Sequence, residues 1–300
     1  MQTKLIVNPY SNKGHTLTLL PQISDTLQKL GVAFDVVQTE APGHATELVQ
    51  QAVAKGYERV VAVGGDGTCN EIANGLLTIT SPERSAILGV IPSGSGNDWA
   101  YILGIPFEID QACAVLKNGS ERMIDVGQVT VDGQPRIFVN SVGLGFDAEV
   151  AIDTKQTKWF RGFALYLWSV FRVLVFGRWP YHAQFSFNSE SHQQPLTLLT
   201  VANGVRAGGG FLLTPEARLD DGLFDICYAS QMSRLSLLGL LPKTLTGTHI
   251  HHRAVTMARS SKVELFVETG IPGHSDGEIL CIDGRRFVFE IFPSSLRVWM

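Results

Sequence analysis

The sequence has few cysteines, no excess of positive charge and no uninterrupted apolar run long enough to span a membrane. Four cysteines in 300 residues stand without paired or metal-type spacing, which favours reduced thiols in a cytosolic protein over a disulfide framework or a zinc site. The N-terminal stretch MQTKLIVNPYSNKG has no apolar core typical of a signal peptide. A net charge of −4 implies no general affinity for nucleic acid.

The most apolar segment, WFRGFALYLWSVFRVLVFGRW at 159–179, is interrupted by Arg172, so we expect no transmembrane segment. Two interpretations of it stay open. In the first, a helix packs on the protein's own core and turns a polar stripe with Arg161 and Arg172 outward. In the second, basic residues beside Trp159, Phe163 and Trp168 place this face against a lipid surface.

The length favours two domains. Residues 1–125 alternate continuous apolar strands with helices, which predicts a parallel α/β domain covered on both faces. Residues 126–300 contain shorter alternating runs with turn signals such as Asp132-Gly133 and Asp283-Gly284, which predict an antiparallel β-sandwich domain. The last residues are expected to return to the first domain. The expected fold class is therefore α/β plus β.

A glycine-rich loop follows the predicted strand 59–63 and reads Gly64-Gly65-Asp66-Gly67-Thr68. Glycines let a phosphate approach the backbone, and the start of the next helix offers N–H groups and a positive dipole end. Asp66 would repel a phosphate unless a cation or a ribose hydroxyl lay between, so the loop suggests a nucleotide with Mg²⁺. Thr68 is expected to cap the following helix as well as touch the ligand.

A second loop, PSGSGNDWAYILGIP at 92–106, follows the neighbouring predicted strand and offers hydroxyls, glycines and the carboxylate of Asp98. The carboxyl ends of parallel strands share one edge of the sheet, so both loops are expected to line one crevice. The turn NPYSNKG at 8–14 and Thr39 also follow predicted strands. This arrangement predicts a nucleotide site, although neither a Walker A loop nor a Gly-x-Gly-x-x-Gly fingerprint is present.

These loops resemble those of diacylglycerol kinase and sphingosine kinase-like lipid kinases of the bacterial type. NAD kinases and phosphofructokinases share a loop like 64–68, but the patterns at 92–106 and 201–229 favour the lipid kinases. The resemblance covers nearly the whole chain. It implies catalytic roles for Asp66 and Asp98, and ATP contacts from Asn8, Pro9, Thr39, Gly64, Gly65, Asp66, Gly67, Thr68, Glu71, Ser93, Gly94, Ser95 and Asn97.

In the second domain, VANGVRAGGGFLLTPEARLDDGLFDICYA at 201–229 resembles the same family. The resemblance implies a structural Mg²⁺ site made by the carboxylate of Asp221 and the main-chain carbonyls of Arg218 and Leu223. Near the C-terminus, Asp-Gly-Glu at 276–278 matches the family's last signature. That match implies that Glu278 is the general base.

Two positions depart from the family's pattern, and one histidine-rich run has a separate interpretation. Tyr101 stands where the family often has arginine, and Asn12 where it often has glycine. The run THIHHR at 248–253 contains three histidines, which we interpret as a solvated loop because adjacent histidines do not easily converge on one ion.

The expected function is ATP- and Mg²⁺-dependent phosphorylation of a lipid hydroxyl, with diacylglycerol converted to phosphatidic acid. The expected protein is cytoplasmic and peripheral to the membrane, and a homodimer is left open. Two alternatives remain: a kinase for a sphingoid base, another lipid alcohol or NAD, and a regulator that binds nucleotide or lipid without turnover.

Overall fold

The computed structural model describes residues 1–79, 86–157 and 162–300, and the side chains of Phe163, Ala164 and Tyr166 are not described. The chain divides into two compact units. Unit 1 comprises Met1–Val126 and Pro293–Met300, and unit 2 comprises Gly127–Phe292. The long strands β5 (Glu121–Val131) and β13 (Glu278–Trp299) carry the chain from one unit into the other.

Unit 1 is built on a parallel sheet in which β2 (Phe34–Gln38), β1 (Thr3–Val7), β3 (Arg59–Gly64) and β4 (Ile87–Pro92) lie side by side in this order. The end of β13 adds to β4 in parallel, with Val298 opposite Leu88. All six residues of β3 and of β4 are buried, as continuous apolar strands between two helical layers require.

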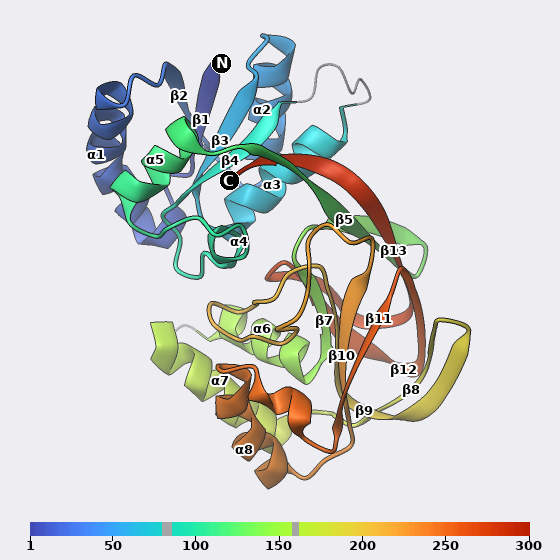
Figure 1. The fold of residues 1–300 in the computed structure, drawn as a ribbon. Helices are drawn as coiled ribbons and strands as arrows, with labels where there is room; N and C mark the ends of the chain where they lie inside the picture. Colours follow the sequence, from blue (N-terminus) through green and yellow to red (C-terminus); the bar gives the residue numbers. More distant parts are fainter. Residues whose placement is uncertain (80–85, 158–161) are drawn as a thin grey trace. The chain divides into compact units, whose positions relative to one another are not determined.

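Helices cover both faces of this sheet (Figure 1). The helices are α1 (His15–Lys29), α2 (His44–Ala54), α3 (Asp66–Leu77), α4 (Asp98–Ile102) and α5 (Ile109–Asn118), preceded by the short 3₁₀ helix η1 (Ser11–Gly14). Residues of α1 and α5, among them Ile23 and Cys113, pack with Val61 and Ile91 of the sheet in one apolar cluster. The predicted α/β architecture is confirmed.

Unit 2 is an antiparallel β-sandwich-like domain. Its strands follow the order β11 (Val255–Ser260), β10 (Phe224–Ser230), β9 (Glu190–Ala202), β7 (Ser141–Gly145), β12 (Lys262–Ser275) and β13. Strand β8 (Tyr181–Phe187) pairs with β9 and β12, and β6 (Gln134–Phe138) pairs with β5. Inward-facing residues such as Phe138, Phe224 and Phe289 form the core, so the predicted β domain is confirmed.

One sequence-based prediction in unit 2 was wrong. Asp283-Gly284 was read as a turn, but it lies within β13, where Gly284 pairs with Ile271 at an irregular part of the ladder. An Asp-Gly pair signals a turn only when its backbone is free to fold back, and here strand pairing decides instead.

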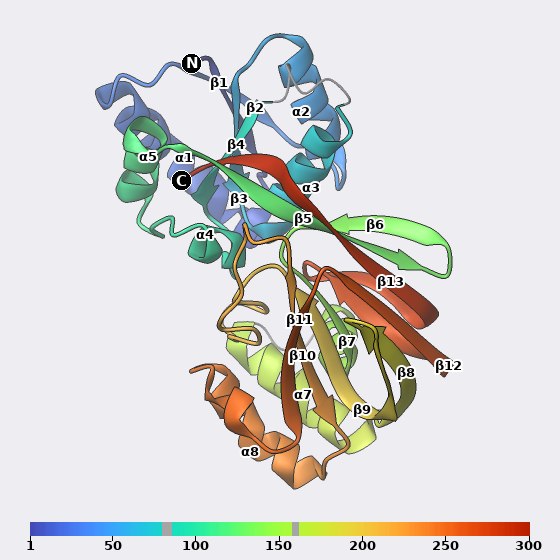
Figure 2. The ribbon, with the colours of Figure 1, turned by 45° about the vertical axis from the view of Figure 1, so that its right-hand side comes forward.

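In the described part of unit 2, the strands are accompanied by the α-helices α6 (Phe146–Gln156), α7 (Gly162–Phe176) and α8 (Arg234–Thr244). Ser233 caps α8, because its Oγ accepts a hydrogen bond of 3.1 Å from the backbone N–H of Ser236. Helices α7 and α8 lie side by side in two views (Figures 1 and 2). Within the described parts of the chain, every helix is too short or too polar to cross a bilayer.

Helix α7 buries one side and exposes another. Val170, Val173 and Leu174 face the core, whereas Trp168 and Phe171 are exposed, Phe171 by 56%. Arg172 lies 3.0 Å from Asp153 of α6. The outer face that the first interpretation expected to be polar is therefore largely apolar in the described part of the helix. Trp159, Arg161 and Phe163, on which the two interpretations also relied, lie outside the described side chains.

The prediction of a solvated loop at 248–253 was only partly correct. It contains the 3₁₀ helix η3 (Thr248–His251), and His249 is buried. The Nε2 atom of His249 lies 3.1 Å from the carbonyl oxygen of Leu213, and burial lowers the pKa of this imidazole. No group of three metal-ligating side chains occurs among the described residues. Of the three histidines only His249 is buried, whereas His251 is exposed.

Candidate active site

The predicted nucleotide loops lie at one edge of the unit 1 sheet, because they follow the carboxyl ends of three adjacent parallel strands. Backbone hydrogen bonds hold the strand ends together. The N–H of Asn8 donates to the carbonyl of Val63 at 3.0 Å, and the N–H of Ser93 donates to the carbonyl of Gly64 at 2.9 Å. Thr39 joins the same edge, since its N–H donates to the carbonyl of Val7 at 2.9 Å.

The two glycine loops pack directly on each other through Gly65 and Gly94. A Cβ atom on Gly65 would lie 3.0 Å from the Cα of Gly94, and a Cβ on Gly94 would overlap Gly65. Asn97 fixes the second loop, because its side chain accepts from the N–H of Gly94 at 2.9 Å and donates to the carbonyl of Gly94 at 3.0 Å. Only glycine permits this backbone-to-backbone approach.

Hydroxyl groups line the same edge. The Nδ2 of Asn8 donates to Oγ1 of Thr68 at 3.1 Å, and Oγ1 of Thr16 donates to Oγ of Ser93 at 2.8 Å. Thr68 was expected to cap α3, but the helix starts at Asp66 and Gly65 takes the capping position without a side-chain bond. Thr68 therefore lies inside the first turn, where its side chain contacts Asn8.

Asp66 and Asp98 each begin a helix, α3 and α4 respectively. The Oδ1 of Asp66 accepts a hydrogen bond of 2.9 Å from the N–H of Trp99, the second residue of α4. Asp66 thereby links the two glycine loops, and its charge suits the N-terminal end of α4. Asp98 is buried at 6% exposure, whereas Gly67 and Ser95 are exposed.

Glu71, expected among the nucleotide contacts, holds a helix end in this structure. Its two carboxylate oxygens accept from the backbone N–H groups of Gly43 at 2.9 Å and Ala45 at 3.1 Å. Its own carbonyl accepts from Oγ1 of Thr46 at 2.9 Å. These contacts satisfy N–H groups at the start of α2, so the structure gives this side chain a capping role. Pro9 lies half-buried beside Asn8.

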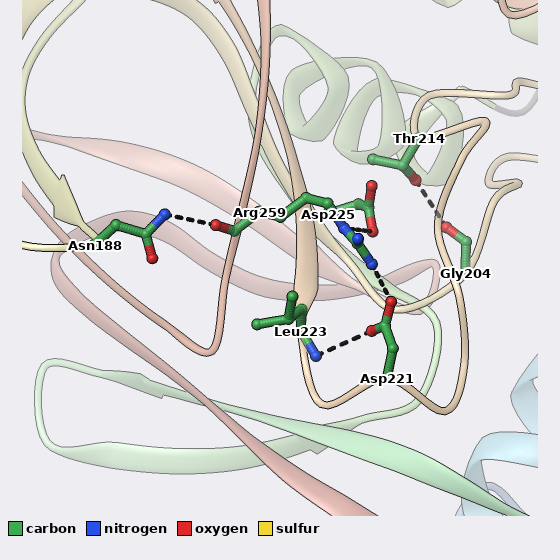
Figure 3. Close-up of polar contacts among 7 residues, drawn as sticks. All are labelled: Asn188, Gly204, Thr214, Asp221, Leu223, Asp225 and Arg259. Carbon is green, nitrogen blue, oxygen red and sulfur yellow. Dashed lines mark hydrogen bonds and ion pairs between the residues drawn. The ribbon is translucent and has the colours of Figure 1, made fainter.

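In unit 2, the three residues expected to bind a structural Mg²⁺ are close in sequence but differ in their contacts, and Figure 3 shows those of Asp221 and Leu223. The Oδ1 of Asp221 accepts from the N–H of Leu223 at 3.1 Å, and its Oδ2 forms an ion pair with the guanidinium of Arg259. Arg218 is exposed. Asp221 is thus already engaged by a cation of the protein itself.

Glu278 follows the tight turn Asp276-Gly277 between β12 and β13. Its Oε2 lies 2.7 Å from Nζ of Lys155 on α6. The turn is held by Asp276, whose carboxylate accepts backbone N–H groups of Val139, Asn140 and Ser141 at 2.9–3.0 Å. The residue expected from the sequence to be the base therefore follows a turn that three hydrogen bonds hold in place.

A second charged pair joins α6 to the other strand of this hairpin, β12. Nε2 of the buried His274 lies 2.8 Å from Oδ2 of Asp147 on α6. Burial disfavours the charged imidazolium, but Asp147 and then Asp276 outweigh it, and the pKa of His274 is raised above 6.5.

The sequence reading missed Thr16, Lys155, Asp147, His274 and Arg259. Asp147 and Lys155 lie eight residues apart on one helix, which is two turns, so they share a face. The pattern could have linked them to each other, but not to His274 and Glu278, which come from a hairpin more than 100 residues later.

The architecture and loops described above are those of a two-domain α/β-plus-β kinase. The model for the diacylglycerol kinase catalytic domain matches residues 2–129, and that for the YegS C-terminal NAD kinase beta sandwich-like domain matches residues 140–300. The chain belongs to the bacterial diacylglycerol kinase and YegS-like lipid kinase family.

Curated relatives agree with this membership, and a solved structure shares the fold. The chain is 33% identical over 275 residues to a YegS-like probable lipid kinase of Pseudomonas aeruginosa, covering 90% of this chain and 86% of the relative. It is 29% identical over 279 residues to a diacylglycerol kinase of Bacillus subtilis, covering 92% and 89%. The fold matches the crystal structure of a diacylglycerol kinase from Bacillus anthracis with a TM-score of 0.74 at 19% identity, covering 99% and 96%.

Proposed function

We propose that this protein transfers the γ-phosphate of ATP to a lipid hydroxyl with the help of Mg²⁺, and that diacylglycerol is its substrate. The observation that carries the proposal is the direct contact of Gly65 with Gly94, which gathers two bare-backbone loops and two carboxylates at one sheet edge. The relative named as a diacylglycerol kinase supports the choice of lipid.

The nucleotide part of the proposal uses the residues at this edge. Backbone N–H groups of the glycine loops bind phosphate, because they present donors without side-chain bulk. The exposed Ser95, and Thr68 buried beside Asn8, add hydroxyl groups. The half-exposed Asp66 and the buried Asp98 supply oxygens of the kind that Mg²⁺ prefers, so the donor set fits this ion. When bound, Mg²⁺ neutralises phosphate charge.

The acceptor part of the proposal rests on Glu278. A lipid hydroxyl must lose its proton as its oxygen attacks phosphorus, and a carboxylate can take that proton. Asp276 fixes the turn that precedes Glu278, and Lys155 forms an ion pair with the Glu278 carboxylate. The remaining catalysis is positioning and charge neutralisation.

We further propose that unit 2 docks on an anionic bilayer through α7 and α8, and that the enzyme is a peripheral membrane protein of the cytoplasm. Trp168 and Phe171 on α7 and Leu235 on α8 are exposed, Leu235 by 82%. The segments 162–178 and 231–254 contain no Asp or Glu, although the chain as a whole is acidic. Their basic residues are Arg172, Arg178, Arg234, Lys243 and Arg253. Arg172 and Arg178 are paired with Asp153 and Asp283 of neighbouring elements, whereas every charged residue within the two segments themselves is basic. An apolar surface on segments that carry only basic charges suits an anionic lipid interface.

The central experiment compares wild type with Asp66→Asn in radiolabelled phosphate transfer from ATP. The acceptor panel contains diacylglycerol, a sphingoid base and other lipid alcohols in mixed micelles, with NAD as a soluble alternative. Asparagine keeps an oxygen that can accept from Trp99 N–H but loses the charge for Mg²⁺, so the fold is expected to persist while turnover is lost.

Phosphatidic acid as the main product supports the proposal. Preferred transfer to another acceptor would replace the proposed substrate. Transfer to none of them by a folded wild type would favour a non-catalytic regulator, and normal turnover by Asp66→Asn would remove Asp66 from the mechanism.

A further inference from the structure

Arg259 and Asp225 stand directly opposite each other in the antiparallel pair of β11 and β10. Side chains of directly opposed residues lie on the same face of a sheet. The Nε of Arg259 lies 3.4 Å from Oδ2 of Asp225, and its Nη2 pairs with Oδ2 of Asp221 in the preceding loop (Figure 3). One guanidinium therefore joins two carboxylates, one from the sheet and one from the loop.

The burial of Asp225 explains why a cation is needed here. The side chain of Asp225 is only 4% exposed, whereas that of Arg259 is 43% exposed. Burial raises the pKa of Asp225, and Arg259 opposes that rise, while Asp221 and Glu216 add to it. A buried carboxylate with acidic neighbours is costly unless a paired positive charge compensates it.

The position of Arg259 is set by the sheet rather than by the loop. Ladder pairs on both sides, Ile226 with Ala258 and Phe224 with Ser260, fix the register. The carbonyl of Arg259 also accepts from Nδ2 of Asn188 at 2.7 Å, as Figure 3 shows. The backbone therefore keeps the guanidinium beside both carboxylates.

This arrangement does not fit a resident Mg²⁺ at Asp221. The resemblance assigns that ion the carboxylate of Asp221 and the carbonyls of Arg218 and Leu223. In the structure, Oδ1 of Asp221 takes the N–H of Leu223 and Oδ2 takes Arg259. Since Mg²⁺ binds oxygen at about 2.0–2.1 Å, the ion would share this carboxylate with a guanidinium of the same charge sign.

We infer that the guanidinium of Arg259, rather than Mg²⁺, is the cation that neutralises Asp221 and Asp225 in this chain. The loop that ends at Leu223 is then tied to the sheet without a metal. Within the same loop, the hydroxyl of Thr214 donates to the carbonyl of Gly204 at 2.7 Å. Any requirement of catalysis for Mg²⁺ then arises at the nucleotide site alone.

The test is the melting temperature of the full chain without nucleotide, in EDTA and in millimolar MgCl₂. For wild type and for Asp221→Asn, the rise in melting temperature between EDTA and MgCl₂ is measured. The excess of the wild-type rise over that of Asp221→Asn reports Mg²⁺ binding at Asp221. We expect this excess to be below ~1 °C, because an ion that does not bind the native state cannot stabilise it. A saturable excess of several degrees would overturn the inference. The readout does not involve activity, so it stands apart from the proposed kinase function.

Variants of the arginine give a second, independent readout. Arg259→Gln is expected to lower the melting temperature in EDTA by about 5 °C or more, because it leaves Asp225 buried without its countercharge. The double variant Arg259→Gln/Asp225→Asn is expected to recover most of that loss. The matched control is Arg178→Gln, which breaks an ion pair to Asp283 with both side chains well exposed. An equal, small effect of Arg259→Gln and Arg178→Gln would contradict the inference.

Discussion

The carboxylate of Glu278 and the ammonium of Lys155 lie 2.7 Å apart, joining the first residue of β13 to helix α6. Glu278 is 56% and Lys155 40% exposed, so this ion pair is worth about 0–1 kcal/mol to folding. The pair therefore positions the carboxylate more than it stabilises unit 2.

Replacement of Glu278 by glutamine is expected to lower kcat by ~10²–10⁴-fold, because an amide cannot accept a proton at neutral pH. The KM for ATP should stay nearly unchanged, since the proposed nucleotide contacts come from the glycine loops. Steady-state kinetics with diacylglycerol in mixed micelles measures both constants. The control is Lys155→Gln, which keeps the base and should cost less in kcat. Near-normal turnover by Glu278→Gln would show that another group takes the proton.

The glycine loops offer a matched pair of substitutions. Gly94→Ala is expected to lower the melting temperature and abolish activity, because its Cβ would overlap the backbone of Gly65. Gly67→Ala meets no atom within 4 Å in the protein and lies in the first turn of α3, so its melting temperature should match wild type.

A raised KM for ATP in Gly67→Ala, with an intact fold, would then locate the nucleotide at this exposed backbone. Unchanged kinetics in Gly67→Ala would argue against close approach of a phosphate at that residue. An unaltered melting temperature in Gly94→Ala would contradict the tight packing of the two loops.

The exposed apolar residues of α7 and α8 should govern access to membrane-bound substrate. Phe171→Ser and Leu235→Ser are expected to reduce binding to vesicles that contain phosphatidylglycerol and to raise the apparent KM for diacylglycerol in them. Activity on a short-chain soluble diacylglycerol should be spared, because only docking is lost. The control is Leu17→Ser, a substitution of an exposed leucine on α1 in unit 1. Equal losses on both substrates would indicate that the two helices serve packing alone.

The pair of His274 and Asp147 makes stability depend on pH. The pKa of His274 in the folded protein is raised above 6.5, so its contribution is fully present below pH ~6.5 and is lost as the pH rises through the folded value. The urea midpoint of wild type should therefore fall over that range more steeply than the midpoint of His274→Gln. Identical slopes in wild type and variant would contradict this assignment.

The sequence by itself determined the two fold classes and the family. Continuous apolar strands alternating with helices define the parallel sheet of unit 1. The kinase family is identified by the loops 64–68 and 92–106, because backbone access to phosphate requires these residue types locally. Such patterns are readable because they arise from neighbours in the chain.

Only the tertiary structure decided what the charged groups touch. Glu71 caps α2, Asp66 caps α4, Glu278 meets Lys155, and Asp221 meets Arg259 across 38 residues of chain. The local sequence Asp221-Gly222 is the same whether or not the fold places a guanidinium beside it. The partner is set by the register of β10 against β11, a long-range pairing that local spacing does not encode.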